Sequence, residues 1–195
     1  MDNANPAHRY AHRAKPFSND LELALSDREL VAERGRSKQT YTLARLERIR
    51  LTFKPRNTAR KAFVCEVRAE DGKSVKFDNI SWKSLIDVEH NSAGYRAFVL
   101  ELVRLAAAAN PKLELLAGLA PWRYRLMQIV GYAFVAALGG AAIMAGLHSS
   151  PVVALACLGL GAYLAFWLHE FLTRNTPRVF RPDAVPEAVL PQLPV

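Results

Sequence analysis

Two long runs of uncharged, apolar residues, separated by four residues, limit the fold of this chain more than any other feature. The first run is Leu126–Leu147. The second is Val152–Leu168, which reaches the length of a membrane span when His169–Leu172 is added. As helices the runs would extend for about 33 Å and about 26 Å, compared with about 30 Å for the hydrocarbon core of a bilayer. A backbone in lipid must satisfy its own hydrogen bonds. We therefore expect a transmembrane hairpin, with helices at 126–147 and 152–172 and a loop at 148–151.

Positive charge beside the runs predicts their orientation. Arginines precede the first run and follow the second, and the connecting loop contains neither Lys nor Arg. Short loops rich in Lys and Arg stay in the cytoplasm, so we expect a two-span protein of the bacterial inner membrane with both termini inside. A hairpin buried in a soluble protein would carry a polar stripe instead. The flanking arginines are Arg123, Arg125, Arg174, Arg178 and Arg181, and aromatic residues expected at the inner interface are Trp122, Tyr124 and Trp167.

The net positive charge belongs to the first 125 residues. The formal net charge is +8, and acidic and basic side chains are equally numerous after residue 125. A basic domain tethered to a membrane is attracted to anionic headgroups, whereas single-stranded nucleic acid would need aromatic side chains among the basic turns. Residues 34–38 and 54–61 contain no aromatic side chain. We expect anionic inner-leaflet lipids as partners, leave open a protein partner or a homo-oligomer, and expect no nucleic acid.

The polar N-terminal region predicts short strands followed by one helix. Apolar and polar residues alternate in most of its segments, as in strands with one buried face. Between Ser92 and Ala109 the apolar residues recur every three or four positions, which predicts an amphipathic helix capped by Ser92 and ended by Asn110-Pro111. The region is therefore expected to be α+β, with a mostly antiparallel sheet. The expected strands are Leu21–Leu25, Glu29–Glu33, Lys38–Leu43, Ile49–Phe53, Phe63–Ala69 and a segment around Val75 and Phe77.

Composition also predicts the boundaries of the domains. Residues 1–17 are expected to form a disordered basic arm, and residues 18–112 a folded cytoplasmic domain. Residues 113–125 would be a linker at the membrane interface. Residues 173–195 contain five prolines, which predict an extended, unpacked cytoplasmic tail.

Two segments of the expected domain resemble bacterial pleckstrin-homology-like (PH-like) domains. They are Ser26–Gly35, with a turn-Asp-Arg and a strand ending in Arg-Gly, and Leu43–Ile49, with a Leu-Glu-Arg-Ile step. The resemblance implies an antiparallel PH-like β-barrel or sandwich capped by a C-terminal helix. It also implies a binding or scaffolding module, and transfers no catalytic residue. The stretch Ser81–Asn91 departs from the pattern because it is long for the connection to the final helix.

Two groups of basic residues flank expected turns in this domain. Either group could bind lipid phosphates or an acidic partner, and the alternative for each is solvated charge with no ligand. The first group is Arg34, Arg36 and Lys38, and the second is Lys54, Arg56, Arg60 and Lys61.

Small residues recur at helical spacing within the two apolar runs. Such stripes let helix backbones approach closely, either between the two spans or between copies of the protein. The residues are Ala136, Gly140, Ala142 and Gly146 in the first run, and Cys157, Gly161 and Ala165 in the second.

Motifs for catalysis and for metal binding are absent from the sequence. There is no GxSxG, P-loop or HExxH motif. His8 and His12 lack a third ligand, and Cys65 and Cys157 lie in a domain and in a span, so we expect no metal, no cofactor and no disulfide. The predicted function is a non-enzymatic membrane protein whose cytoplasmic domain is a binding or scaffold module. The alternative is a small accessory subunit of a transporter or channel that oligomerises through its hairpin.

Overall fold

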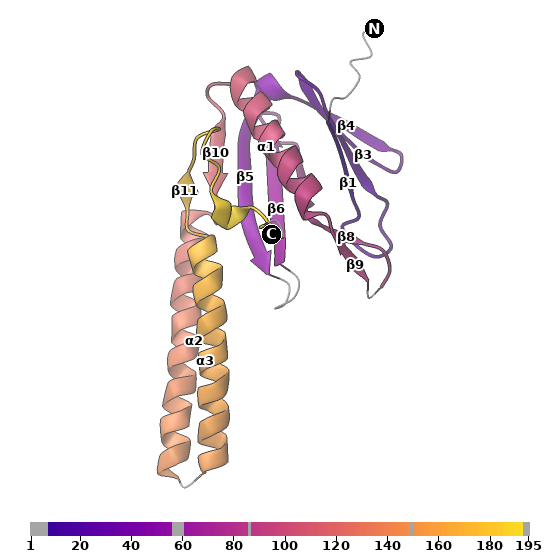
Figure 1. Ribbon diagram of the computed structural model, residues 1–195. Coiled ribbons are helices and arrows are strands. Elements are labelled where there is room, and N and C mark those ends of the chain that lie inside the picture. The colour runs from indigo at the N-terminus through magenta and orange to yellow at the C-terminus, as the bar shows by residue number, and fades with distance from the viewer. Residues whose placement is uncertain (1–7, 56–60, 86, 149, 193–195) are drawn as a thin grey trace. The chain divides into compact units, whose positions relative to one another are not determined.

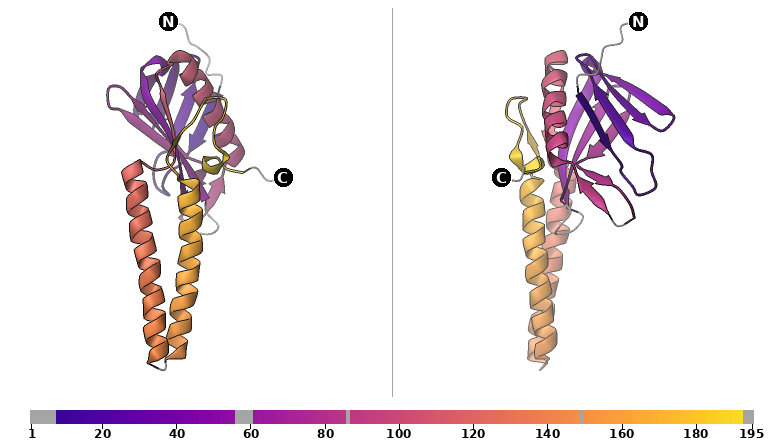
Figure 2. Two further views of the ribbon diagram at one scale, coloured as in Figure 1. Left: turned by 90° about the vertical axis from the view of Figure 1, so that its left-hand side faces the viewer. Right: turned by 45° about the vertical axis from the view of Figure 1, so that its right-hand side comes forward.

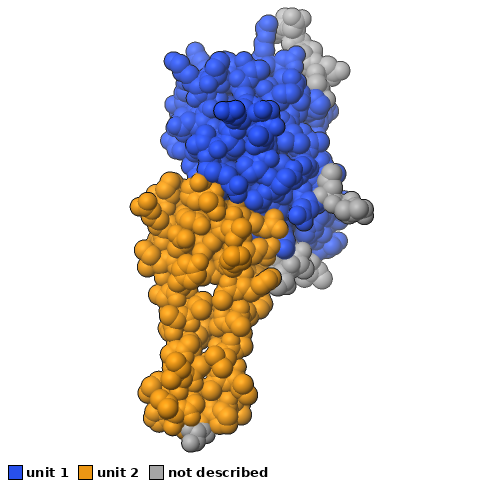
Figure 3. All heavy atoms as spheres, turned by 60° about the vertical axis from the view of Figure 1, so that its left-hand side comes forward, with its two compact units in different colours: residues 1–118, 178–195 blue, residues 119–177 orange. Residues whose placement is uncertain are grey.

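The computed structural model describes residues 8–55, 61–85, 87–148 and 150–192. It divides into two compact units, coloured separately in Figure 3: unit 1 comprises residues 1–118 and 178–195, and unit 2 comprises residues 119–177. In the described part of the chain, antiparallel strands dominate unit 1, and the three α-helices come after most of these strands in sequence. The expected α+β class is confirmed.

A four-stranded antiparallel sheet begins unit 1 (Figure 1). Leu21, Leu23 and Leu25 are buried, while the residues between them are more exposed, because successive side chains of a strand point to opposite faces. Gly35 has a φ of +59° in the turn between the third and fourth strands, a conformation that suits glycine. In spatial order, the strands are β1 (His8–His12), β2 (Leu21–Leu25), β3 (Glu29–Arg34) and β4 (Ser37–Thr42).

The second sheet of unit 1 has five strands and combines segments from both ends of the chain. Its order is β11-β10-β5-β6-β7, and every neighbouring pair is antiparallel except β10 and β5, which are parallel. A short 3₁₀ helix, η1 (Leu43–Arg45), joins β4 to β5, and β8 (Ile80–Trp82) pairs with β9 (Val88–His90). The strands are β5 (Leu46–Pro55), β6 (Lys61–Ala69), β7 (Ser74–Asp78), β10 (Glu114–Ala117) and β11 (Arg178–Val179).

Helix α1 (Ser92–Ala109) has the bounds expected from the sequence. Its N-cap is Asn91 rather than Ser92, because the Asn91 side chain accepts a hydrogen bond from the Gly94 backbone N–H at 3.1 Å. The helix packs on β1 and η1 (Figures 1 and 2). Two of its buried residues, Tyr95 and Phe98, are aromatic and contact Tyr10 and Phe77, with ring centroids 5.6–6.1 Å apart. One aromatic cluster therefore joins the helix to both sheets.

The N-terminal arm expected over residues 1–17 is wrong for residues 8–12, which form β1. This strand pairs with β2 along its whole length, and it buries Tyr10 and His12. The sequence obscured it because a strand of this length shows only two inward positions, one of them a histidine, amid polar residues. Residues 1–7 lie outside the described residues.

The linker and the unpacked tail expected from the sequence are also wrong. Residues 114–117 form β10 inside the five-stranded sheet. The proline-rich segment forms β11 and a 3₁₀ helix, η2 (Glu187–Val189), and buries Phe180, Val189 and Leu190 in the core. Prolines favour this outcome because a fixed φ lowers the entropy lost on folding, and the apolar residues between them gain from burial.

Unit 2 is an antiparallel pair of helices, α2 (Pro121–Leu147) and α3 (Pro151–Arg174), that lie side by side (Figure 2). Both are long and apolar enough to cross a membrane. Each begins with a proline, a residue suited to the first turn of a helix, so α2 starts five residues earlier than expected and includes Trp122–Arg125. Because α3 starts at Pro151, the connection is also shorter than expected.

Candidate functional site

The candidate site lies in unit 1, at the end of the five-stranded sheet where β10 ends and β11 begins. The chain leaves the sheet after β10 and returns as β11, and these strands pair with Ala117 opposite Arg178. Two further hydrogen bonds hold this corner: Gly118 N–H to Leu51 C=O at 2.8 Å, and Phe180 N–H to Leu115 C=O at 3.0 Å. Because strands of one sheet cannot lie on opposite sides of a membrane, helices that cross it must return the chain to the side that it left.

Two members of the second basic group, Lys54 and Lys61, lie at the same end of this sheet. Strand β10 runs parallel to β5 with Ala117 opposite Leu51, so both strands point toward the end where the chain leaves. Lys54 lies three residues further along β5, about 10 Å beyond that point. Lys61 opens β6 opposite Pro55. Lys54 is exposed and Lys61 is half-buried, so these two residues bring positive charge to the end of the sheet that carries the hairpin.

Two other members of the second basic group, Arg56 and Arg60, lie outside the described residues. The first group lies in the other sheet, at the turn between β3 and β4, so the strand pairings do not combine the two groups into one site. Lys38 pairs with Glu33, with Nζ 2.8 Å from Oε1. Arg34 and Arg36 are exposed.

An ion pair between α1 and the C-terminal segment was not predicted from the sequence. Arg96 donates hydrogen bonds to both carboxylate oxygens of Glu187, with Nη1 2.6 Å from Oε2, and a further one to the Pro191 C=O at 3.3 Å. The hydrogen bond from Arg96 lowers the pKa of the Glu187 carboxyl. The partners are 91 residues apart in sequence, and no local pattern signals such a contact.

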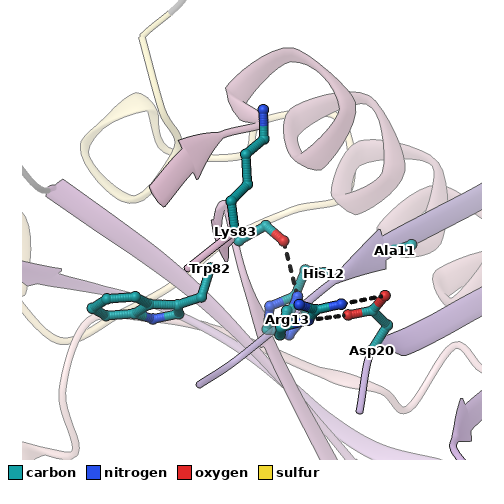
Figure 4. A pocket seen from close by; sticks show the side chains of 7 residues that line it. Ala11, His12, Arg13, Asp20, Trp82 and Lys83 are labelled. Carbon is teal, nitrogen blue, oxygen red and sulfur yellow. Dashed lines mark hydrogen bonds and ion pairs between the residues drawn. The ribbon is translucent and has the colours of Figure 1, made fainter. Parts of the chain in front are cut away.

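A polar pocket of about 280 Å³ lies between β1 and β8 (Figure 4). At its rim Arg13 forms a bidentate ion pair with Asp20, with distances of 2.6 and 3.3 Å. His12 is buried, and its Nδ1 lies 3.8 Å from Asp78 Oδ1. The cations that line this pocket are paired within the protein, since Lys83 Nζ lies 3.2 Å from Glu89.

The structure places His8 and His12, for which the sequence offers no third metal ligand, apart from one another. His8 and His12 stand four residues apart on a strand, about 13 Å along it, rather than on one face of a helix. His8 is exposed, with Nε2 3.7 Å from Glu101. Among the residues that the structure describes, no group of three or more His, Cys, Asp or Glu side chains could hold a metal ion.

The two cysteines are both free thiols. Cys65 lies in β6 and is buried, and this burial raises the pKa of its thiol. Cys157 lies in α3.

The small residues of α2 and α3 differ in burial. Gly161 and Ala142 are buried, and Cys157 and Ala165 are half-buried. A Cβ placed on Gly161 would meet the Leu138 Cβ at 3.7 Å, which puts this part of α3 against α2. Ala136, Gly140 and Gly146 are exposed instead.

A closer approach involves Gly131, which was not among the expected packing residues. A Cβ there would lie 2.6 Å from a methyl carbon of Leu168. Gly131 and Leu138 are seven residues apart on α2, as Gly161 and Leu168 are on α3, and this heptad spacing is typical of helices that supercoil. The seven-residue spacing in both helices, rather than the positions of small residues alone, therefore indicates which faces of α2 and α3 pack together.

No model of a protein family, no curated protein and no solved structure matches this chain. The class of protein therefore rests on its own structure: an α+β chain with antiparallel sheets and two helices that are long and apolar enough to span a membrane.

Proposed function

We propose that this chain is a non-enzymatic, two-span protein of the bacterial inner membrane whose unit 1 is a binding or scaffold module held at the cytoplasmic surface. The basic turn between β5 and β6 would contact anionic headgroups of the inner leaflet. The observation that carries this proposal is the shared end of the sheet: the chain leaves toward α2 at the end where Lys54 and Lys61 lie. Along the chain, only Leu119 and Ala120 lie between unit 1 and α2.

Strand order supports the PH-like assignment in part. A four-stranded antiparallel sheet, three further antiparallel strands and a helix occur along the chain in the order that the resemblance implies, with the β8–β9 pair between β7 and α1. The parallel strand β10, the strand β11 and the packed C-terminal segment are additions to that pattern. We propose that unit 1 is a PH-like domain in which these additions join the domain to the hairpin.

The cytoplasmic orientation rests on the residues at the hairpin's open end. Trp122 is 63% exposed, and the Arg123 guanidinium lies 5.1 Å from the centre of its ring, an arrangement suited to a headgroup region. At the end of α3, Arg174 pairs with Glu170 at 3.2 Å. The tip of the hairpin at Leu147 and Pro151 has no Lys or Arg nearby in the sequence.

Topology reporters test this orientation. Alkaline phosphatase, which is active only outside the cytoplasm, should be inactive when fused after Val195 and active when inserted at Ser149. The expected contrast is at least tenfold, because the two sites would lie on opposite sides of the membrane. A fluorescent protein that folds only in the cytoplasm should give the reverse pattern at both positions. Activity of the phosphatase at the C-terminal fusion would contradict the proposal.

Amine labelling tests contact between the basic turn and anionic lipid in the intact protein. The full chain is placed in nanodiscs of neutral lipid, or of neutral lipid mixed with phosphatidylglycerol, and treated with a water-soluble amine reagent. We expect Lys54 and Lys61 to react several-fold more slowly with anionic lipid present. High salt should remove the difference, because the Debye length falls from about 10 Å at 0.1 M to about 3 Å at 1 M.

Lys73 is the matched internal control for this labelling. It precedes β7 in the turn after β6, so it lies at the opposite end of the same sheet and should react equally in both nanodiscs. Equal reaction of Lys54 and Lys61 in the two lipids would contradict the lipid-facing role.

A second candidate function, an accessory subunit that assembles through its hairpin, is favoured by one observation. Ala136, Gly140 and Gly146 remain exposed although α3 covers another face of α2. Exposed small residues would let a further helix approach. The basic turn has no part in this alternative, so the amine labelling separates the two candidates.

A further inference from the structure

One edge of the five-stranded sheet is open at β7. In the part of the chain that the structure describes, β7 pairs with β6 on one side and with no strand on the other. The hydrogen bond from Ala69 N–H to Lys73 C=O shows that the backbone groups of Lys73 point toward β6. The hydrogen-bonding direction of the backbone alternates along an antiparallel strand. The N–H and C=O groups of Val75 and Phe77 therefore point toward β6, and those of Ser74 and Lys76 point away from it.

Asp78, the next residue whose backbone groups should point away from β6, agrees with this assignment. The Asp78 C=O accepts a hydrogen bond from the Tyr10 hydroxyl of β1 at 2.7 Å. The edge of β7 is therefore covered at Asp78 and open at Ser74 and Lys76, which offers an added strand up to four backbone hydrogen bonds.

A pocket of about 370 Å³ lies beside this open edge. Its apolar lining comes from Leu21, Ala32 and Val75, and its polar lining includes Arg34, Ser74 and Lys76. The pocket therefore combines an unpaired strand edge with apolar surface, the two features by which sheets recognise extended peptides.

The charge around the pocket selects the kind of peptide. Among the described residues that line it, none is acidic. Arg34 forms part of the wall, and Arg36 follows it in the same exposed turn. Lys76 pairs with Glu66 at 3.2 Å but is 56% exposed, so its pair is weak and can be exchanged. A peptide with acidic side chains would complement this wall.

We propose that unit 1 binds an extended, acidic peptide segment of a partner protein as an added strand along β7, with Arg34 and Lys76 facing its carboxylates. The inference rests on the proposed role of unit 1 as a binding module, and it gives the first basic turn a function separate from that of Lys54 and Lys61. It requires backbone hydrogen bonds as well as charge, and this requirement makes it testable.

The probe is a fluorescent octapeptide of alternating Glu and Val, titrated against the full chain in nanodiscs of neutral lipid and followed by fluorescence anisotropy. A second peptide has the same side chains, but N-methyl groups block the N–H groups on both edges of the strand. This change removes the strand hydrogen bonds and keeps the charge. A third peptide alternates Lys and Val. We expect only the first to bind, with at least tenfold higher affinity than the others.

Variants of the protein test the same contacts from the other side. Ser74→Pro removes an outward N–H at the first position of β7, where the ladder with β6 does not use it. Arg34→Glu reverses the charge of the wall. Each should weaken binding at least tenfold, whereas Lys112→Glu, at an exposed site before β10, should change it less than twofold. Circular dichroism checks that each variant keeps its fold.

Three outcomes would overturn the inference. They are failure of the Glu-Val peptide to bind, equal binding of its N-methylated form, and loss of the anionic-lipid effect on Lys54 and Lys61 in Arg34→Glu, which would assign this turn to lipid. The N-methylated peptide tests the strand pairing with the unaltered protein, so the inference can be refuted even if Ser74→Pro unfolds. Peptide binding without lipid protection of Lys54 would instead refute the lipid-facing role and leave this inference standing.

Discussion

Replacing residues 119–177 with a short turn is expected to give a water-soluble, folded form of unit 1. The hairpin is inserted between two strands that are already neighbours, since Ala117 of β10 lies opposite Arg178 of β11. A loop of two to four residues, such as one containing Asn-Gly, can therefore join them as an ordinary β-hairpin. Gly118, with a φ of +78°, already turns the chain there. The replacement also removes most of the large apolar side chains that are exposed, including Leu147 and Val152.

Size-exclusion chromatography and amide hydrogen exchange would check this result. We expect a monomer in which the N–H groups of Gly118 and Phe180 are protected, because they bond to Leu51 and Leu115. The matched control is the fragment 18–112, the domain expected from sequence alone. It lacks β1, β10 and β11 and should aggregate or remain partly unfolded. A well-folded 18–112 fragment beside an aggregated hairpin-free protein would contradict the structure.

Removing the chain after Pro177 is expected to unfold unit 1, although the hairpin and most strands remain. The deletion takes Phe180, Val189 and Leu190 out of the core together with the ion pair between Glu187 and Arg96. Each buried apolar side chain of this size contributes about 1.5–3 kcal/mol. Three of them contribute about 6 kcal/mol, which is comparable with the whole stability of many domains, about 5–15 kcal/mol.

Two valines in this segment allow a milder comparison. Val189 is fully buried, whereas Val179 is 77% exposed. Val189→Ala should lower the free energy of unfolding by about 2 kcal/mol, and Val179→Ala by less than about 0.5 kcal/mol. Pulse proteolysis of the full chain in detergent micelles, over a series of urea concentrations, measures both. Equal urea midpoints for the two variants would show that the segment does not pack as described.

Local patterns predicted the elements that depend on a single periodicity. Ile49, Leu51 and Phe53 alternate with polar residues, and they form the buried face of β5. The apolar residues of Ser92–Ala109 recur at helical spacing, and the helix has those bounds. The two apolar runs form helices that are long and apolar enough to cross a membrane.

Elements that depend on distant partners were missed. Strand β10 is a four-residue Glu-Leu-Leu-Ala segment without alternation, and it becomes a strand because β5 and β11 flank it. The packing of the C-terminal segment depends on α1, whose Arg96 lies 91 residues before Glu187. The residues of both basic groups could be identified from the sequence alone. That Lys54 and Lys61 share an end of the sheet with the hairpin depends on the parallel pairing of β10 with β5, which local sequence does not encode.

The pairing of β10 with β11 also sets an order of events during biogenesis. Strand β11 and the buried residues Val189 and Leu190 are synthesised only after both spans, so the ribosome releases the first 118 residues well before their sheet can close. In the topology that we propose, β10 keeps an open edge and the core keeps an uncovered apolar face until α3 has inserted and its C-terminal end has returned to the starting side. A chain with a misinserted span cannot hide these surfaces, and exposed edges and apolar patches promote aggregation. In the proposed topology, closure of the sheet would thus couple maturation of unit 1 to correct insertion of the hairpin.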